Sequence, residues 1–262
     1  MSDAVIEVLR PSAHRVEIWL NRPDVRNAFN NEVVDGLHQA FAQVAEDEQV
    51  RVVMLGGRGK AFCAGGDLRM MRASGDFTWE QNYAGAQAMA DMMAMFDACP
   101  VPVVARVHGD CYAGGMGLVS LADIVVAVPD ITFCLSEARL GLLPATISPY
   151  VVRAMGYRQA SRYFVTAERF DARRAHEIGF VQELASSENL DARVEAILTA
   201  IETCGPQGVR QSKKLVRDVH GQDLTPELRA ETARRIADIR ASDEGKEGVS
   251  SFLEKRQPNW LV

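Results

Sequence analysis

Two short glycine-rich segments carry the backbone groups best suited to chemistry in this sequence. GKAFCAGGDL (59–68) and HGDCYAGGMG (108–117) each follow a predicted buried strand and lead into a predicted helix. Glycines at a helix N-terminus expose backbone N–H groups where the helix dipole is positive. Two such turns brought together would direct two N–H donors at one oxygen, forming an oxyanion hole that stabilises charge on a carbonyl. The alternative is that the glycines only permit tight turns.

Several other catalytic designs are absent from the sequence. It contains no GxxxxGK[ST] phosphate loop, no GxGxxG, no HExxH and no GxSxG nucleophile elbow. Its five histidines do not pair at metal-ligand spacing, and its five cysteines include no CxxC pair. We therefore expect no metal, no cofactor and no disulfide framework, and a reducing cytoplasm as the location.

The elements that must position the two turns alternate between strands and helices. A helix is predicted over 31–47, with Asn30 or Asn31 as its N-cap, and a second over 79–98, stopped by CPVP. Beyond Pro144 the pattern is mostly helical, and Gly179 closes one helix before a short last strand. The predicted strands are 16–20, 51–55, 103–107, 123–128, 131–135 and 180–184. This pattern predicts an α/β core over residues 1–187 and a helical segment over 188–262.

Length and charge narrow the class of protein. A chain of 262 residues can form one large domain, and 47% hydrophobic with 24% charged residues is ordinary for a globular protein. The net charge of −6 argues against a nucleic-acid surface. No apolar run approaches the roughly 18 residues that a membrane span needs, and the first residues do not resemble a signal peptide. We expect neither a nucleic-acid nor a membrane partner.

Five segments, in order, resemble the enoyl-CoA hydratase/isomerase (crotonase) superfamily. They are WLNRPDVRNAFN (19–30), KAFCAGGDL (60–68), GGMGLVSLADIVVA (114–127), SEARLGLLP (136–144) and SDEGKEGVSSFLEKRQPNW (242–260). The resemblance covers nearly the whole chain. It implies a ββα superhelix core, a C-terminal helical trimerisation segment, and a homotrimer or dimer of trimers. It also implies an acyl-CoA thioester as the substrate, with coenzyme A entering as part of that substrate.

The resemblance also implies roles for individual residues. The amides of Gly66 and Gly114 would hold the thioester oxygen. Several of the residues implied to bind CoA also have a simpler possible role. Arg26 could be only a surface charge, and Asp67 could be only a helix cap. Phe252 and Lys255 could be only an i, i+3 pair on a helix. The residues implied to bind substrate or CoA are Arg26, Ala28, Ala64, Asp67, Leu68, Phe252 and Lys255.

One catalytic carboxylate is present where the family pattern often has two. Glu137, in LSEARLG, occupies the position of one glutamate, and we expect it to be the general acid/base. A lone loop glutamate is usually only solvated, but its place in the family motif favours catalysis. The other glutamate would lie three residues after Gly114, where this chain has Gly117. A single glutamate is typical of the enoyl-CoA isomerases and also occurs in hydratase-like subgroups.

The segment PATISPYVV (144–152) replaces the glycine-rich stretch of most crotonases. It resembles the bacterial branch that hydrates 3-methylglutaconyl-CoA or isohexenylglutaconyl-CoA, substrates with a second carboxylate. An arginine would suit that carboxylate because it offers a bidentate fork, and we hypothesise that Gly117 makes room for such a branched substrate. The candidate arginines are Arg69, Arg72, Arg139 and Arg153, each of which could equally be a solvated surface charge.

The sequence is therefore compatible with three functions. The first is a hydratase acting on a branched glutaconyl-CoA, with Glu137 as acid/base. The second is a Δ3,Δ2-enoyl-CoA isomerase in which the single glutamate shuttles a proton. The third is a non-catalytic protein of the same fold that binds acyl-CoA or RNA, which the retained glutamate, the two glycines and the acidic balance disfavour.

Overall fold

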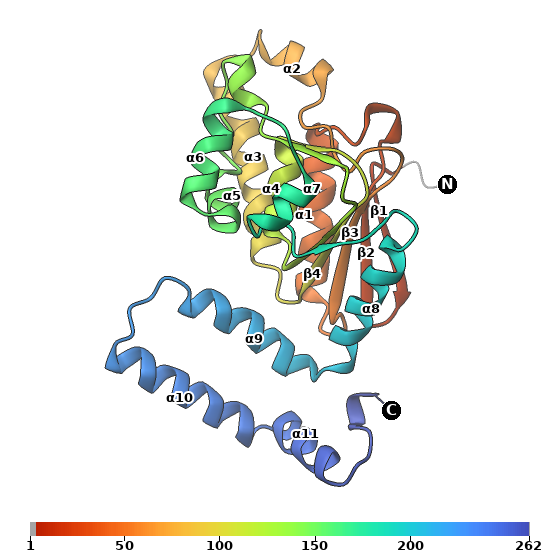
Figure 1. Cartoon of the computed structure of the whole chain (residues 1–262), viewed down its shortest axis with the longest axis vertical. Coiled ribbons are helices and arrows are strands. Elements are labelled where there is room, and N and C mark those ends of the chain that lie inside the picture. Colours follow the sequence, from red (N-terminus) through yellow and green to blue (C-terminus); the bar gives the residue numbers. More distant parts are fainter. Residues whose placement is uncertain (1–3, 262) are drawn as a thin grey trace.

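A computed structural model describes residues 4–261 and shows an α/β core from which a helical arm extends (Figure 1). The centre of the core is a six-stranded sheet in the order β1-β2-β3-β4-β6-β9. β1 and β2 are antiparallel, and every other neighbouring pair is parallel. The strands are β1 (Ile6–Ser12), β2 (Arg15–Leu20), β3 (Val52–Gly57), β4 (Val103–Val107), β6 (Ile124–Ala127) and β9 (Glu183–Leu184).

A second, three-stranded sheet lies beside one end of the first. It is formed by β5 (Cys111–Tyr112), β7 (Thr132–Cys134) and β8 (Phe170–Asp171), in that order. β5 pairs in parallel with β7, so the second glycine turn, which follows β5, is held next to the end of β7. Because Glu137 comes directly after β7, this small sheet is the element that brings it near the glycines.

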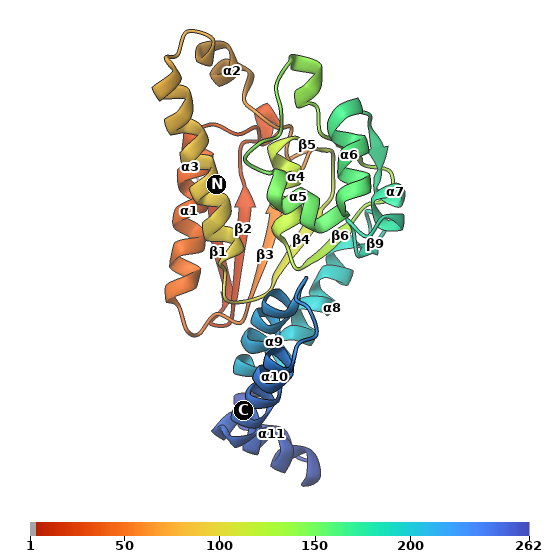
Figure 2. The ribbon, with the colours of Figure 1, turned by 90° about the vertical axis from the view of Figure 1, so that its left-hand side faces the viewer.

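Helices cover both faces of the large sheet. On one face lie α1 (Asn31–Glu46), α3 (Trp79–Asp97) and α4 (Gly114–Leu121), whose apolar side chains form the main core with those of the strands. On the other face α8 (Leu190–Thr203) packs Leu190, Val194 and Leu198 against the sheet. The first helix beyond residue 188 is therefore part of the packed core, as Figure 2 shows.

The two long helices of the core begin and end where the sequence predicts. The Asn30 side chain caps α1 by accepting the N–H of Val33 at 3.0 Å, and Thr78 caps α3 in a capping box with Gln81. The rings of Phe41 and Phe96 stack with centroids 4.1 Å apart and join the two helices. α3 ends at Asp97, three residues before Pro100, the first of two prolines that cannot continue it.

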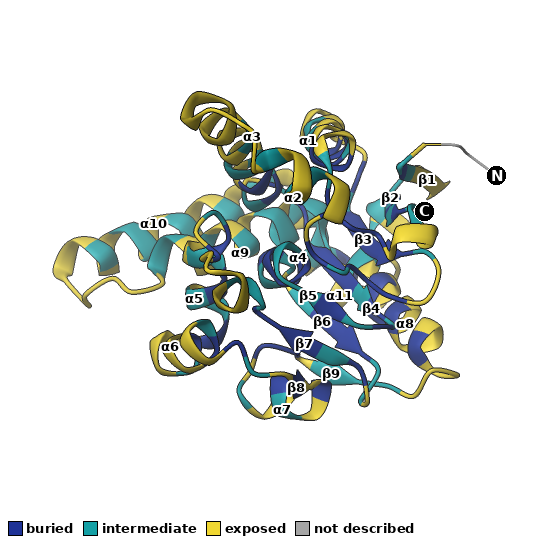
Figure 3. Ribbon diagram, turned by 90° about the horizontal axis from the view of Figure 1, so that it is seen from above, coloured by how far each residue is buried: buried dark blue, intermediate teal, exposed yellow. Residues whose placement is uncertain are grey.

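The remaining helices build the rim of the core and the arm. The rim consists of α2 (Leu68–Ser74), the 3₁₀ turn η2 (Glu137–Leu140), α5 (Ser148–Met155), α6 (Tyr157–Thr166) and α7 (Ala172–Glu177). The arm consists of α9 (Pro206–Val219), α10 (Pro226–Ala241) and α11 (Asp243–Leu253). Neither α9 nor α10 buries a residue, whereas the central strands β3, β4 and β6 are almost wholly buried (Figure 3).

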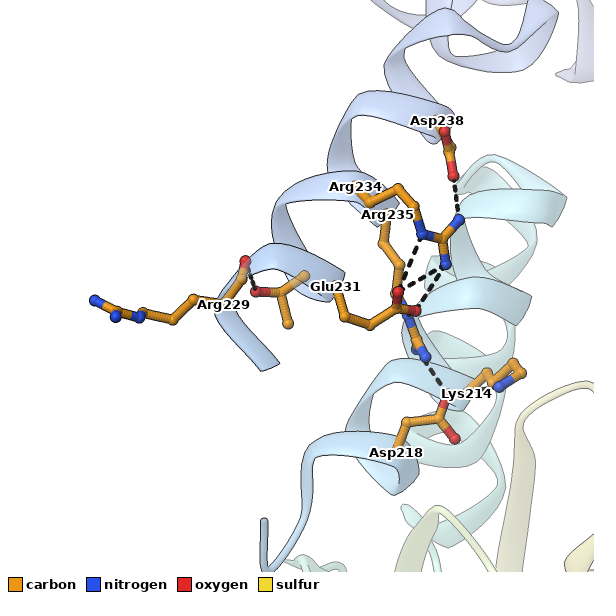
Figure 4. A network of polar contacts seen from close by, with 8 residues as sticks. Lys214, Asp218, Arg229, Glu231, Arg234, Arg235 and Asp238 are labelled. Carbon is orange, nitrogen blue, oxygen red and sulfur yellow. Dashed lines mark hydrogen bonds and ion pairs between the residues drawn. The ribbon is translucent and has the colours of Figure 1, made fainter. Parts of the chain in front are cut away.

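An ion pair links α9 to α10. Arg235 of α10 lies 2.6 Å from Asp218 of α9, and Arg234 pairs with Glu231 and Asp238 along α10 itself (Figure 4). Exposed pairs of this kind are each worth about 0–1 kcal/mol. The arm therefore presents its apolar side chains to the outside instead of burying them within one chain.

Candidate active site

The two glycine turns lie side by side and open into one cavity. The N–H of Cys63 donates to Asp110 O at 3.2 Å, and the N–H of Tyr112 donates to Cys63 O at 2.8 Å. The first turn is also tied to the start of α1, because Phe29 donates to Gly65 O at 2.7 Å. The cavity measures about 790 Å³ and is bordered by both turns, α2, α3 and the loop around Glu137. The turns predicted from the sequence are thus brought together.

The amides of Gly66 and Gly114 are available as donors in this cavity. Both glycines line it, and neither amide has an acceptor among the described residues. Gly114 is the first residue of α4, where an N–H has no partner within the helix and the helix dipole is positive. A Cβ on Gly114 would lie 3.1 Å from the Phe29 ring, so a larger residue there would have to displace the ring.

Ala113 holds the second turn in a strained conformation. Its φ of 49° and ψ of −118° lie outside the regions favoured by residues with a Cβ. Such a conformation costs of order 1–3 kcal/mol and persists only where surrounding contacts enforce it. Here Ala113 donates its N–H to Cys134 O at 2.9 Å, which fixes the turn on the small sheet. The strain lies at the residue immediately before the donor amide of Gly114.

Glu137 places a carboxylate in the same cavity. It begins η2, directly after β7, and its Oε2 is buried without a hydrogen-bond partner in the described chain. Burial raises the pKa of Glu137 above its ordinary value of 4.5, because the charged form loses hydration. A buried, unpaired carboxylate is costly to keep, and a raised pKa suits a group that must both take and give a proton.

The space beside Gly117 is filled by protein, so the hypothesis that this glycine makes room for substrate is wrong. Gly117 is buried in α4, and a Cβ there would lie 2.4 Å from Cγ2 of Ile147 and 2.9 Å from Cε of Met93. Ile147 belongs to the PATISPYVV segment and itself lines the cavity. The glycine at position 117, in place of a second acid, and Ile147 of the PATISPYVV segment therefore pack against each other.

Three of the residues implied to bind substrate lie on the cavity wall. Ala64 and Leu68 line it, and Leu68 is 81% exposed. Asp67 lines it too, but its carboxylate caps α2 by accepting the N–H of Arg69 at 2.8 Å and pairs with Arg22 at 2.9 Å. These contacts, with the Arg69 amide first, lower the pKa of Asp67. Asp67 thus acts as a helix cap, the simpler of the two roles considered for it.

The other implied CoA-binding residues lie off the wall. Arg26 is exposed and Ala28 is buried, and neither lines the cavity, although Arg26 O accepts the N–H of Ala64 at 2.9 Å. Phe252, 81% exposed, and Lys255 lie at the end of α11, at the opposite end of the molecule from α2 (Figure 1). A contact of these two residues with a ligand in the cavity would have to come from another copy of the chain.

None of the four candidate arginines reaches the cavity. Arg69, Arg72 and Arg139 are exposed and absent from its lining, and Arg153 instead pairs with Asp97 at 2.5 Å. No Arg, Lys or His of the described residues lines the cavity, whose wall is mainly apolar. The predicted arginine for a second carboxylate is therefore not found within one chain.

Sequence reasoning missed the residues that fix the first turn. The Asn27 side chain, which is wholly buried, donates to Ala61 O at 2.9 Å and accepts the N–H of Arg22 at 2.9 Å. Arg22 also donates to Ala28 O at 2.6 Å, besides its pair with Asp67. In the sequence, Arg22 and Asn27 of NRPDVRNAFN (21–30) are visible only as polar residues in a loop, and such residues are usually solvated.

The described part of the chain offers neither a metal centre nor a membrane span. Within residues 4–261, no group of three or more His, Cys, Asp or Glu is arranged to hold a metal ion. In the same range, no helix has the length and apolar character needed to cross a membrane.

Comparison with known proteins identifies the family. The profile of the Enoyl-CoA hydratase/isomerase family matches residues 12–261, so the chain belongs to that family. Enoyl-CoA hydratase ACTT6 of Alternaria alternata is 33% identical, over 94% of this chain and 80% of that protein. Among solved structures, an enoyl-CoA hydratase from Shewanella pealeana is 38% identical with a TM-score of 0.93, covering 98% of this chain and 96% of the other. One from Mycobacterium smegmatis is 34% identical with a TM-score of 0.92, covering 98% and 99%. The predicted fold is confirmed.

Proposed function

We propose that this protein is an enoyl-CoA hydratase that adds water across the C2–C3 double bond of a 2-enoyl-CoA. The amides of Gly66 and Gly114 hold the thioester oxygen, and Glu137 is the general acid/base. The observation that carries the proposal is that two donor amides without acceptors share a cavity with a carboxylate whose Oε2 is buried and has no partner among the described residues. The match to the Enoyl-CoA hydratase/isomerase family and the similarity to proteins named enoyl-CoA hydratases support the same reaction class.

The chemistry follows from these groups. Hydrogen bonds from the two amides draw electrons toward the thioester oxygen, which makes C3 electrophilic. Ionised Glu137 takes a proton from water while the water oxygen bonds to C3, and the electron pair of the double bond moves to give an enolate. Protonated Glu137 then gives its proton to C2, which restores the carbonyl and the carboxylate. Dehydration is the same sequence reversed.

A narrower form of the proposal names a branched glutaconyl-CoA, as the PATISPYVV segment suggests. Within one chain the cavity wall favours an apolar acyl group over a diacid, because no lining residue carries a positive charge. An unpaired carboxylate buried against an apolar wall would cost several kcal/mol. The diacid ester would need a cation from a second copy of the chain.

A Δ3,Δ2-enoyl-CoA isomerase is the second candidate. It is favoured by the packing of Ile147 against Gly117, which leaves Glu137 as the one carboxylate of the described wall with a buried oxygen that has no hydrogen-bond partner. Isomerisation needs only one base, because the proton removed from C2 can be returned to C4.

The absorbance of the conjugated thioester distinguishes these functions. Purified protein is mixed with crotonyl-CoA, 3-methylglutaconyl-CoA and a 3-enoyl-CoA in separate assays. We expect absorbance to fall with the 2-enoyl esters as water adds. A rise with the 3-enoyl ester and no fall with the others would replace the hydratase by the isomerase. No change with any ester would support the non-catalytic alternative.

We further propose that the arm assembles copies of the chain into a homotrimer or dimer of trimers. The support is that the arm exposes large apolar side chains, which in a single chain have no partner. We place the protein in the cytoplasm, since all the cysteines are free. Measurement of the mass in solution tests the assembly. The exposed apolar residues of the arm are Val216, Leu224, Ile236, Val249, Phe252 and Leu253.

A further inference from the structure

Between the two glycine turns lies a buried thiol that the proposed mechanism does not use. Cys63 is wholly buried, and its main chain pairs with Asp110 and Tyr112, so its side chain lies where the turns meet. A Cβ on Gly115 would be 2.7 Å from Cβ and 3.1 Å from Sγ of Cys63. Only a glycine at position 115 lets the second turn approach the sulfur this closely.

The amides that face the sulfur are the direct neighbours of the proposed donors. The N–H groups of Gly65 and Gly115 are directed at Sγ of Cys63 and partly offset the effect of burial on its thiol. Burial is the larger effect and raises the pKa of Cys63 to about 12, so the thiol stays protonated and the sulfur acts as a neutral acceptor. Gly65 is adjacent to Gly66, and Gly115 is adjacent to Gly114.

We propose that Cys63 is a positioning residue of the oxyanion hole, whose sulfur anchors the Gly65 and Gly115 amides and thereby directs the Gly66 and Gly114 amides into the cavity. The inference rests on the proposed function, because it assigns a purpose to the same two donors. Cys63 itself does not line the cavity.

The physical need for such an anchor comes from the glycines themselves. Gly-Gly pairs have the widest choice of backbone conformation, so they permit the close approach of the turns without fixing the direction of their N–H groups. Gly65 has a φ of 90°, a conformation that glycine adopts readily but does not hold alone. An acceptor shared by one amide from each turn restricts both turns together. An oxyanion hole works only if its donors are oriented before the charge develops.

Removing the sulfur should therefore weaken catalysis more than binding. In Cys63→Ala the two anchored amides lose their acceptor while the cavity wall stays intact. We expect kcat for crotonyl-CoA hydration to fall roughly 10-fold, the rate equivalent of about one hydrogen bond, with KM changed less than about 3-fold. Cys63→Ser keeps an acceptor of similar size and should remain within about 3-fold of the wild type in kcat.

A spectroscopic readout separates positioning from a general loss of structure. Butyryl-CoA labelled with carbon-13 at the thioester carbonyl has no double bond to hydrate, and its carbonyl stretching frequency falls when the oxygen accepts hydrogen bonds. Isotope-edited infrared spectra are recorded for wild type, Cys63→Ala, Cys63→Ser and Cys99→Ala. Cys99 is a matched control, buried at 1% exposure at the far end of α3.

The expected result is a lowered frequency in the wild type, Cys63→Ser and Cys99→Ala, and a frequency closer to that of free thioester in Cys63→Ala. A lowered frequency that is unchanged in Cys63→Ala, with normal kcat, would overturn the role of Cys63 while leaving the oxyanion hole standing. Wild-type protein with no lowered frequency would instead overturn the hole itself. If Cys63→Ala fails to fold, loss of the shift in folded Cys63→Ser overturns the inference, and its retention supports it.

Discussion

Gly117→Ala tests the packing of Ile147 against Gly117, the position at which a site with two glutamates would carry its second acid. The added methyl would lie 2.4 Å from Cγ2 and 2.9 Å from Cβ of Ile147, well inside the ordinary carbon contact of about 3.5–4.0 Å. Ile147 is 2% exposed and β-branched, so it has little freedom to turn away. Overpacking of this severity costs about 3 kcal/mol, of which alanine's better helix propensity returns about 1 kcal/mol. We expect a net loss of about 2 kcal/mol in the free energy of unfolding.

A double-mutant cycle measured by urea unfolding assigns that loss to Ile147. Ile147→Ala alone should cost about 2–5 kcal/mol. Because it removes the Cγ2 that the new methyl meets but leaves Cβ at position 147 and Cε of Met93, each 2.9 Å away, Gly117→Ala in that background should cost about 1 kcal/mol or less, a coupling of at least about 1 kcal/mol. Gly85→Ala is the control, since Gly85 is a helical glycine whose Cβ position is open, and it should stabilise by up to about 1 kcal/mol.

Two results would refute this reasoning. One is a Gly117→Ala protein as stable as the wild type, and the other is additivity of the two substitutions. If the reasoning holds, Gly117→Glu alone cannot install a second catalytic acid, because Ile147 occupies the position that the side chain must cross.

Four further results are expected. Because burial raises the pKa of Glu137 and hydration needs its ionised form, kcat/KM should fall as pH drops through a pKa above 4.5, and a pH profile without that limb would contradict the role of Glu137. Because the pKa of Glu137 is raised, the folded protein binds this proton more tightly than the unfolded chain does. Glu137→Gln should therefore be more stable than wild type at neutral pH, and this gain should vanish at low pH. Equal melting temperatures of the two proteins at every pH would contradict this. Gly114→Pro removes one donor N–H, and turnover should fall at least about 100-fold in a variant with an unchanged melting curve, whereas full activity there would show that the hole is misplaced. Asp67→Ala loses the α2 cap and the pair with Arg22, so urea unfolding should show a loss of about 1 kcal/mol, and an unchanged midpoint would show that the cap contributes nothing.

Elements with a strong local signal could be predicted from the sequence. The helix expected over 31–47 is α1, Asn30 is its cap, and the helix expected over 79–98 is α3. Their apolar stripes and stop signals lie within the elements themselves. β1 was not predicted, because it is largely exposed and contains Pro11, and β5 and β8 are too short to show a period.

The candidate site was predictable only as far as its backbone motifs reach. The turns at Gly66 and Gly114 and the carboxylate of Glu137 each follow a strand, and the order of strands brings them together. Which side chains fill the space between these groups depends on contacts between residues that are far apart in the sequence. Ile147 fills the space at Gly117 from thirty residues away, a relation that residue types at either position do not reveal. The same holds for Cys63, whose neighbours belong to both turns.

In the proposed mechanism Glu137 alone transfers the proton while the two amides hold the thioester. The most direct test is the rate of absorbance loss with crotonyl-CoA for Glu137→Gln against wild type, together with the affinity of each for CoA. The change keeps the size of the side chain and removes its ability to take a proton. The account predicts unchanged CoA affinity and a kcat lowered at least about 100-fold. A folded Glu137→Gln protein that hydrates crotonyl-CoA at nearly the wild-type rate would contradict it.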